Sequence, residues 1–215
     1  VEEALRRGFE TWAGVRASSS RKYLQEPGLH FLELDFAHTD RLYEQLKAHR
    51  EAHGAFDYVV HCAGVTKCID PADFDRVNCG QTCALANALR SLDMTPRQFA
   101  FISTLSVFGP VHEDTYKPIR ETDTPQPNTA YGRSKLKAEQ ALLAMDGFPC
   151  VIYRPTGVYG PRERDYFLMA ESIKRHLDMS VGYRRQDLTF VYVKDVVQAV
   201  FLGIERGVTG RAYFL

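Results

Sequence analysis

The sequence predicts a doubly wound α/β fold, in which helices cover both faces of a parallel sheet. Short apolar runs rich in β-branched and aromatic residues alternate with longer segments of helical period, and no repeat or low-complexity linker interrupts them. Such alternation is typical of parallel sheets that are covered on both faces. The 215 residues, 45% hydrophobic and 25% charged, suit one globular domain with a full core.

Each element is predicted from its own run of residues. Strands are expected at 10–16, 29–34, 56–63, 98–104, 150–154, 188–193 and 211–215. Helices are expected at 39–53, 72–92, 129–146, 163–177 and 194–206, after a short N-terminal helix that ends at Gly8. The stretch 108–128 contains four prolines and is expected to be irregular, and loops of that length inside a domain are usually functional.

Charge and cysteine usage exclude several classes of partner. The 27 basic and 27 acidic residues cancel without a Lys/Arg tract, so neither nucleic acid nor a membrane is an expected partner. The five cysteines include no CxxC pair and suit reduced thiols in the cytoplasm, with no metal site expected. Because the sequence starts without methionine and stops on an apolar run, we expect it to be the middle of a longer protein.

The stretch "TAYGRSK" at 129–135 begins a predicted helix and places Tyr131 and Lys135 on one face, four residues apart. An ammonium near a phenol favours the phenolate, so we expect Lys135 to lower the pKa of Tyr131 and to prepare it for proton transfer. The pair alone is also common on ordinary exposed helices. Its neighbours strengthen the functional interpretation, because Ser103, Thr104 and Ser106 in "FISTLSVFG" end a buried strand at the sheet edge where ligands bind.

Six segments in order, "DYVVHCAG", "VNCGQT", "FISTLSVFG", "YGRSK", "RPTGVYGPR" and "FVYVKDV", resemble the extended short-chain dehydrogenase/reductases, the epimerase/dehydratase-like proteins. The resemblance covers essentially the whole chain. It implies a catalytic group of Thr104, Tyr131 and Lys135. Thr104 would hydrogen-bond the substrate oxygen, Tyr131 would exchange its proton, and Lys135 would bind the nicotinamide ribose. Ser103, adjacent to Thr104, is the alternative hydroxyl.

The resemblance also implies a dinucleotide cofactor. The family's glycine-rich turn is absent, so 1–160 is expected to be an NAD(P)-binding Rossmann domain without its first strand, and 161–215 the start of a substrate-binding region. The loop after the second strand of such a domain carries Arg16, Ser18 and Arg21 and no acid, which favours NADP over NAD. The resemblance implies further cofactor contacts from Asp35, Phe36, Cys62, Ala63, Gly64 and Pro155.

The expected reaction is reduction of a carbonyl on a small-molecule substrate by an NADP-dependent oxidoreductase. A nucleotide-sugar 4-epimerase or dehydratase is the alternative, and a non-catalytic dinucleotide-binding regulator is the third. Gly157 and Leu188 stand where sugar-nucleotide enzymes of the family carry diphosphate-binding Asn and Arg, although Arg184 or Arg185 could substitute. Resemblance to the family implies a homodimer, with the helix of Tyr131 in the interface.

Several other polar or reactive residues are expected to have structural rather than functional roles. His49 and His53 are predicted to lie on a solvated helix face, and Cys79 and Cys83 to be small core residues. Asn78 is expected to be architectural, and Asp195 to cap the last helix.

Overall fold

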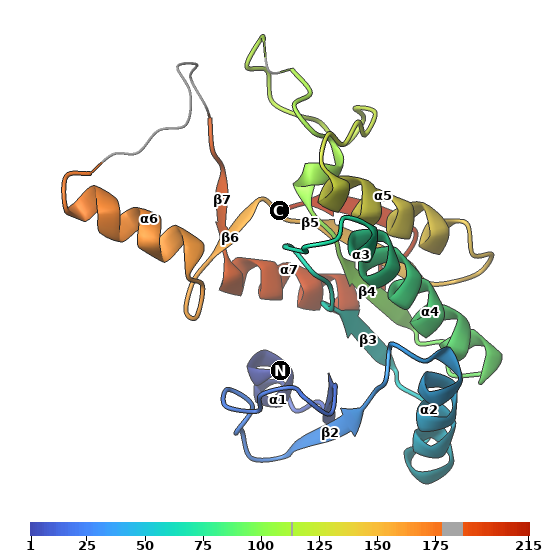
Figure 1. The fold of residues 1–215 in the computed structure, drawn as a ribbon. Helices are drawn as coiled ribbons and strands as arrows, with labels where there is room; N and C mark the ends of the chain where they lie inside the picture. Colours follow the sequence, from blue (N-terminus) through green and yellow to red (C-terminus); the bar gives the residue numbers. More distant parts are fainter. Residues whose placement is uncertain (113, 178–186) are drawn as a thin grey trace.

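A four-stranded parallel sheet forms the centre of the protein. The structure is a computed structural model that describes residues 1–112, 114–177 and 187–215 (Figure 1). The strands, in spatial order, are β3 (Tyr58–His61), β4 (Gln98–Ile102), β5 (Cys150–Arg154) and β8 (Arg211–Phe214), and all neighbours are parallel. The doubly wound α/β prediction is confirmed. All seven predicted strands form, within two residues of the expected ends in most cases.

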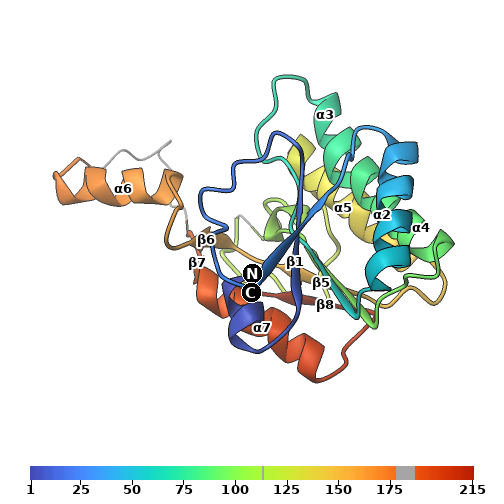
Figure 2. The same cartoon turned by 90° about the horizontal axis from the view of Figure 1, so that it is seen from below.

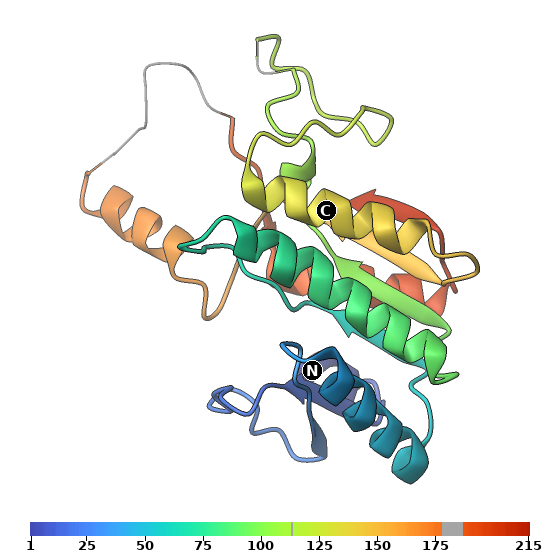
Figure 3. The same cartoon turned by 45° about the vertical axis from the view of Figure 1, so that its right-hand side comes forward.

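Helices cover both faces of this sheet (Figures 1 and 3). On one face, α4 (Thr82–Ser91), α5 (Ala130–Leu143) and α2 (Thr39–His53) contribute apolar side chains that pack on alternate residues of β4 and β5 such as Phe99 and Ile152. On the other face, α7 (Val193–Glu205) packs on the intervening strand residues, including Val151. Strands buried on both faces explain the continuous apolar runs of the sequence.

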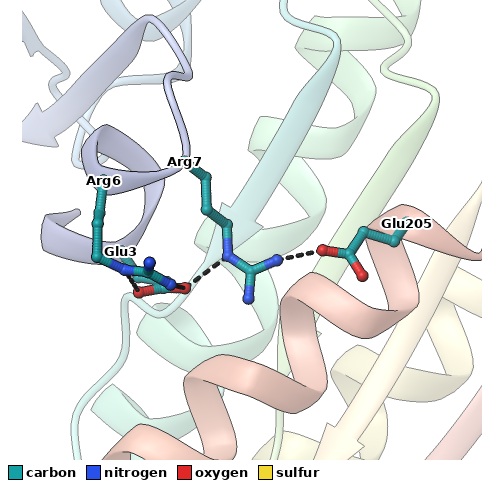
Figure 4. Close-up of polar contacts among 4 residues, drawn as sticks. All are labelled: Glu3, Arg6, Arg7 and Glu205. Carbon is teal, nitrogen blue, oxygen red and sulfur yellow. Dashed lines mark hydrogen bonds and ion pairs between the residues drawn. The ribbon is translucent and has the colours of Figure 1, made fainter.

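A second, two-stranded parallel sheet is made by β1 (Thr11–Val15) and β2 (Leu29–Glu33), with Thr11 opposite Leu29. It lies beside α1 (Glu2–Arg6), as Figure 2 shows. Helix α1 is attached to α7 by charge, because the Glu3 carboxylate accepts hydrogen bonds from Arg6 and Arg7, and Arg7 also pairs with Glu205 (Figure 4). These guanidinium groups lower the pKa of Glu3 to about 2. The predicted helix end at Gly8 is confirmed by its positive φ of 81°.

A third group of elements, two short strands and a helix, extends away from these two sheets. Strands β6 (Gly157–Tyr159) and β7 (Phe190–Tyr192) are parallel, and helix α6 (Asp165–Lys174) projects from them (Figures 1 and 2). No residue of α6 is buried. Strand β6 was not expected from the sequence, because its three residues follow a proline and include Gly157. We call β6, α6 and β7 the α6 arm.

The expected helix at 72–92 is confirmed as one continuous helical stretch made of a short α3 (Ala72–Phe74), a π-helical segment (Asp75–Gln81) that contains the buried Asn78, and α4. Two other predictions need correction. His49 is buried rather than solvated, since its ring packs between Trp12 and Phe56. Asp195 does not cap α7, which begins at Val193; it lies in the first turn, where the helix dipole favours an acid.

The described part of 108–128 contains no helix or strand, as its prolines predict, and the short helical turn η2 (Leu105–Val107) ends just before it. All five cysteines are free; Cys79 and Cys83 are half-buried, and Cys79 packs against the core. No helix within the described ranges has the length and apolar character needed to cross a membrane.

Candidate functional site

Thr104 lies two residues beyond the end of β4, at the carboxyl end of the central sheet. Its backbone is extended, and its hydroxyl begins the turn Leu105–Val107 by accepting a hydrogen bond from the amide of Ser106 at 3.2 Å. The same oxygen lies 3.1 Å from Ser106 Oγ. Ser103, next to it, is buried, and its Oγ has no hydrogen-bond partner among the described residues. The strand end therefore holds two hydroxyls, of which Thr104 is the one oriented by a turn.

Tyr131 is the second residue of α5, as the "TAYGRSK" stretch predicted. The helix begins because the Thr129 hydroxyl accepts from the amide of Gly132 at 3.0 Å, which caps its first turn. Tyr131 lies near Thr104, whose hydroxyl acts to lower the pKa of the phenol. Burial acts more strongly in the opposite direction, so the pKa of Tyr131 is raised overall.

Lys135 lies one turn beyond Tyr131 but does not tune it in this structure. Only 4% of the residue is exposed, and Nζ donates to the carbonyl of Ile102 at 2.6 Å while lying 4.1 Å from the centre of the Phe101 ring. The expected lowering of the Tyr131 pKa by Lys135 is therefore corrected; the ammonium is engaged by the end of β4. Burial lowers the pKa of Lys135 itself to about 8.

A buried hydrogen-bond network holds this helix against the rest of the site. Asn78 donates to Ser134 Oγ and to the carbonyl of Val65, and accepts from the amide of Val65 at 2.8 Å. Ser134 in turn donates to the carbonyl of Tyr131. These contacts give Asn78 the architectural role expected from the sequence.

The predicted cofactor residues lie on two different sheets. Cys62, Ala63 and Gly64 follow β3 and are exposed, and Pro155 follows β5 and is buried. Pro155 also contacts the turn after Thr104, since its carbonyl accepts from the amide of Leu105 at 2.9 Å. At the carboxyl end of the central sheet, the structure therefore gathers this group with Thr104, Tyr131 and Lys135.

The remaining cofactor candidates accompany the two-stranded sheet. Arg16, Ser18 and Arg21 lie on the exposed loop after β1, and the Arg21 guanidinium stacks on Phe31 at 4.4 Å. Asp35 follows β2, where its carboxylate contacts His38 and the amide of Ala37; the hydrogen bond from His38 lowers its pKa most. Phe36 packs against the main core.

A cleft of about 620 Å³ lies in the α6 arm, lined by aromatic and polar side chains that include Tyr159, Glu163, Tyr166 and Phe190. Gly157 lies beneath two of these rings. A Cβ on Gly157 would come within 2.8 Å of Tyr166 Oη and 2.9 Å of Phe190. Leu188 is exposed, while Arg184 and Arg185 lie outside the described residues. No group of three or more His, Cys, Asp or Glu side chains in the described ranges is arranged to hold a metal ion.

Sequence reasoning missed one charged pair at this site. Glu139 in α5 and Arg154 at the end of β5 form a buried ion pair with a shortest distance of 2.7 Å. Two signals could have found it: Glu139 repeats the four-residue spacing of Tyr131 and Lys135, and Arg154 ends an otherwise apolar strand.

Comparison with solved structures agrees with the overall fold. The chain aligns with RMD from Pseudomonas aeruginosa complexed with NADPH at a TM-score of 0.72 and 25% identity, covering 96% of this chain and 77% of that one. It also shares the fold of the Bordetella bronchiseptica enzyme WbmG in complex with NAD and UDP, at a TM-score of 0.78, 21% identity and coverage of 100% and 66%. The fold is that of the Rossmann-fold, NAD(P)-binding proteins.

The particular family follows from the sequence matches. Residues 1–215 match the model of the NAD dependent epimerase/dehydratase family, and the chain belongs to this family of enzymes. It is 30% identical over 173 residues to GDP-6-deoxy-D-mannose reductase of Pseudomonas aeruginosa, covering 73% of this chain and 56% of that protein. It is 28% identical over 170 residues to UDP-glucose 4-epimerase of Vibrio cholerae, covering 73% and 50%. The chain thus spans about half the length of the curated relatives it matches.

Proposed function

We propose that this protein is an NADP-dependent oxidoreductase that reduces a carbonyl of a small-molecule substrate, with Thr104, Tyr131 and Lys135 as its catalytic group. The observation that carries the proposal is the convergence of Thr104, Tyr131 and Lys135 at the carboxyl end of β4, where Thr104 begins the turn after the strand and Lys135 Nζ donates to the carbonyl of Ile102 at 2.6 Å. A hydroxyl pair at this edge of a parallel sheet can meet a substrate oxygen from two sides.

In the proposed reaction, Tyr131 Oη donates its proton to the carbonyl oxygen of the substrate while Thr104 Oγ1 donates a hydrogen bond to the same oxygen. The raised pKa of Tyr131 keeps the phenol protonated at neutral pH, as an acid in the reductive direction requires. Lys135 would bind the nicotinamide ribose, as the family resemblance implies. The bound dinucleotide supplies the hydride that reduces the carbonyl carbon.

The residues at the strand ends fit a nicotinamide dinucleotide. Ser103 Oγ and Thr156 Oγ1 are buried without partners among the described residues, after β4 and β5 respectively, and such groups are rare unless a ligand or water satisfies them. Gly64 lets the backbone after β3 approach Asn78, because a Cβ there would come within 2.9 Å of Oδ1. Pro155 and the Cys62–Gly64 segment would hold the nicotinamide end.

NADP is favoured over NAD by the loop after β1. Arg16 and Arg21, with Ser18, offer cationic and hydroxyl donors to a 2′-phosphate, and no acidic residue lies among residues 16–22. The relative RMD was solved with NADPH, whereas WbmG was solved with NAD. Asp35 and Phe36 would contact the adenine from the next strand end.

We propose further that a strand and glycine-rich turn preceding residue 1 complete the Rossmann domain of 1–160, with 161–215 beginning the substrate-binding region. Strands β1 and β3 belong to separate sheets. In β3, 43% of Val60 is exposed, although the strands of parallel sheets are normally covered on both faces. A version with additional N-terminal residues should bind NADPH more tightly than residues 1–215. Equal affinity in fluorescence titrations would reject the completed sheet.

The second candidate is a nucleotide-sugar 4-epimerase or dehydratase. It is favoured by the match to UDP-glucose 4-epimerase and by the human dTDP-D-glucose 4,6-dehydratase, which is 29% identical over 168 residues. Against it stands Gly157, whose position under Tyr166 and Phe190 has no room for the asparagine expected in sugar-nucleotide enzymes. This packing is why carbonyl reduction is our first choice.

The test is turnover by the full-length protein with NADPH or NADH and a panel of aldehydes, ketones and nucleotide sugars. We expect NADPH oxidation with a carbonyl substrate and at least a hundredfold loss in Tyr131→Phe, in line with the ~10²–10⁴-fold effect of a positioned proton donor. The matched control is Tyr116→Phe, an exposed tyrosine in the irregular stretch. Undiminished activity in Tyr131→Phe would reject the catalytic group, and conversion of a nucleotide sugar without net NADPH oxidation would establish the second candidate.

The oligomeric state and cellular location belong to the same proposal. We propose a homodimer in the cytoplasm with α5 in the interface, where Leu143 is half-exposed. Sedimentation of Leu143→Glu tests the interface, since a charge there should favour the monomer.

A further inference from the structure

The buried ion pair between Glu139 and Arg154 is an unusual feature for a sheet core. Only 1% of Glu139 and 8% of Arg154 are exposed. Arg154 Nε lies 3.1 Å and 3.2 Å from the two carboxylate oxygens, and Nη2 lies 2.7 Å from Oε2. Buried ion pairs are seldom retained for stability alone, because well-packed apolar residues serve as well or better. Stability alone therefore does not explain why this buried pair is present.

Arg154 connects the pair to the turn that carries Thr104. Its guanidinium lies 5.1 Å from the centre of the Phe108 ring, which follows that turn. The next residue, Pro155, accepts a hydrogen bond from the amide of Leu105. A displacement of Arg154 would therefore move the turn relative to the strand end.

Glu139 connects the pair to Lys135. The two residues are one turn apart on α5, and both are buried against the sheet. The other ionisable groups that interact with Lys135 are Cys62 and His61, from β3 and its end. Burial lowers the pKa of Lys135, while Cys62 and Glu139 raise it. Of these groups, Glu139 is the carboxylate, and Arg154 holds it in place.

We propose that Glu139 and Arg154 are positioning residues, a pair that fixes α5, and with it Lys135, against the Thr104 turn. The consequence for activity rests on the proposed function, but the effect on Lys135 does not. The charge of Glu139 acts through Lys135, and Arg154 acts by orienting Glu139. Neither side chain contacts the reacting atoms.

The test compares a charge-free pair with an exposed pair on the same helix. Glu139→Gln/Arg154→Met removes both charges and leaves no buried charge unpaired. Lys137→Met/Asp75→Asn removes the exposed ion pair between α5 and the π-helical segment and serves as the control. Glu139→Gln alone keeps the shape of the side chain if the double variant does not fold, and Glu139→Asp keeps the charge.

The first readout does not depend on activity. In protein labelled with ¹⁵N-lysine, the Nζ resonance of Lys135, assigned with Lys135→Met, is followed against pH. We expect the titration to move down by about one pH unit in Glu139→Gln/Arg154→Met and in Glu139→Gln, and to stay near the parental value in Glu139→Asp and in the control. A Lys135 titration unchanged in both variants that lack the Glu139 charge overturns the proposal, whether or not the protein reduces a carbonyl.

The second readout is the pH profile of kcat/KM with NADPH. The alkaline limb should move down with the Lys135 titration, which reduces kcat/KM about fivefold at pH 8 for a one-unit shift. A shifted Lys135 titration in a protein without NADPH oxidation would support the positioning role and reject the proposed function. A uniform loss at every pH with an unchanged titration would show a purely structural pair and overturn the inference.

Discussion

The central sheet and the α6 arm are built from similar apolar segments and differ in what covers them. In β4 and β5, nearly every side chain is buried between α4 and α5 on one face and α7 on the other. In α6 no residue is buried, and Phe167, Leu168 and Ile173 are more than half exposed. Both regions are therefore rich in apolar residues, but these side chains are buried in the central sheet and exposed on α6.

This difference in burial shows which region contributes most to the free energy of unfolding of the described chain. Apolar side chains contribute free energy only when they leave water, so Phe99 at 0% exposure contributes and Phe167 at 64% contributes little. The candidate catalytic residues stand on the covered region, where their positions are fixed by packing. The cleft of the α6 arm is lined partly by α6, which has no buried residue. A segment with so few buried contacts can change conformation when a ligand binds.

The largest expected contrast comes from truncating one phenylalanine in each region. Phe99→Ala should lower the free energy of unfolding by about 3–5 kcal/mol, because it leaves a cavity beside Phe148 and His61. Phe167→Ala should change it by less than about 0.5 kcal/mol. Urea unfolding followed by circular dichroism measures both, and equal losses would contradict the comparison.

A second contrast uses pH. His61 in β3 is buried next to three phenylalanine rings, and burial lowers its pKa to about 4. The unfolded chain therefore takes up the proton first, and the stability that His61 contributes is complete above about pH 6.5 and is lost as the pH falls toward 4. The loss should reach roughly 3 kcal/mol from a shift of this size.

Urea midpoints at pH 7.5 and pH 5 test this prediction. His61→Gln, which retains a donor for Thr82, should flatten the pH dependence. His176→Gln, an exposed histidine just beyond α6, should leave it as in the parent. If both variants keep the full pH dependence, another group is responsible.

A smaller effect is expected where α5 meets the Thr104 turn. A Cβ on Gly132 would come within 2.4 Å of the carbonyl of Ser106, so Gly132→Ala must push the helix away from the turn. We expect a loss of about 1–3 kcal/mol together with a fall in any activity that depends on Thr104 and Tyr131. Gly80→Ala is the control, because its Cβ would make only an ordinary contact at 3.7 Å. Thermal melts and NADPH oxidation should separate the two variants.

The smallest effect concerns α1. Arg7→Ala removes the ion pairs to Glu3 and Glu205 and the stacking on Phe201, and should cost about 1 kcal/mol or less since these groups are partly solvated. Because the pKa of Glu3 is lowered, the attachment of α1 should persist at neutral pH and weaken as the pH falls below about 4. Hydrogen exchange of the α1 amides measures it, and protection unchanged by Arg7→Ala would contradict this attachment.

Local patterns were sufficient for most elements and for the candidate site. Alternation of strands and helices predicted the parallel sheet, and the spacing of Tyr131 and Lys135 predicted their shared helix face. The hydroxyls after β4 were predicted at the edge where ligands bind. The expected direction of the Tyr131 pKa shift was wrong, because burial and the contact of Lys135 with Ile102 depend on how closely α5 approaches β4.

Periodicity and short motifs were enough for the fold class, the family resemblance and the residues that meet at the carboxyl edge of the sheet. Only the packed structure shows that His49 is buried, that the helix is π-helical at Asn78 and that Arg154 is the partner of Glu139. It also decided which apolar segments are covered. These outcomes depend on which elements pack together across long sequence separations, and no local pattern carries that information.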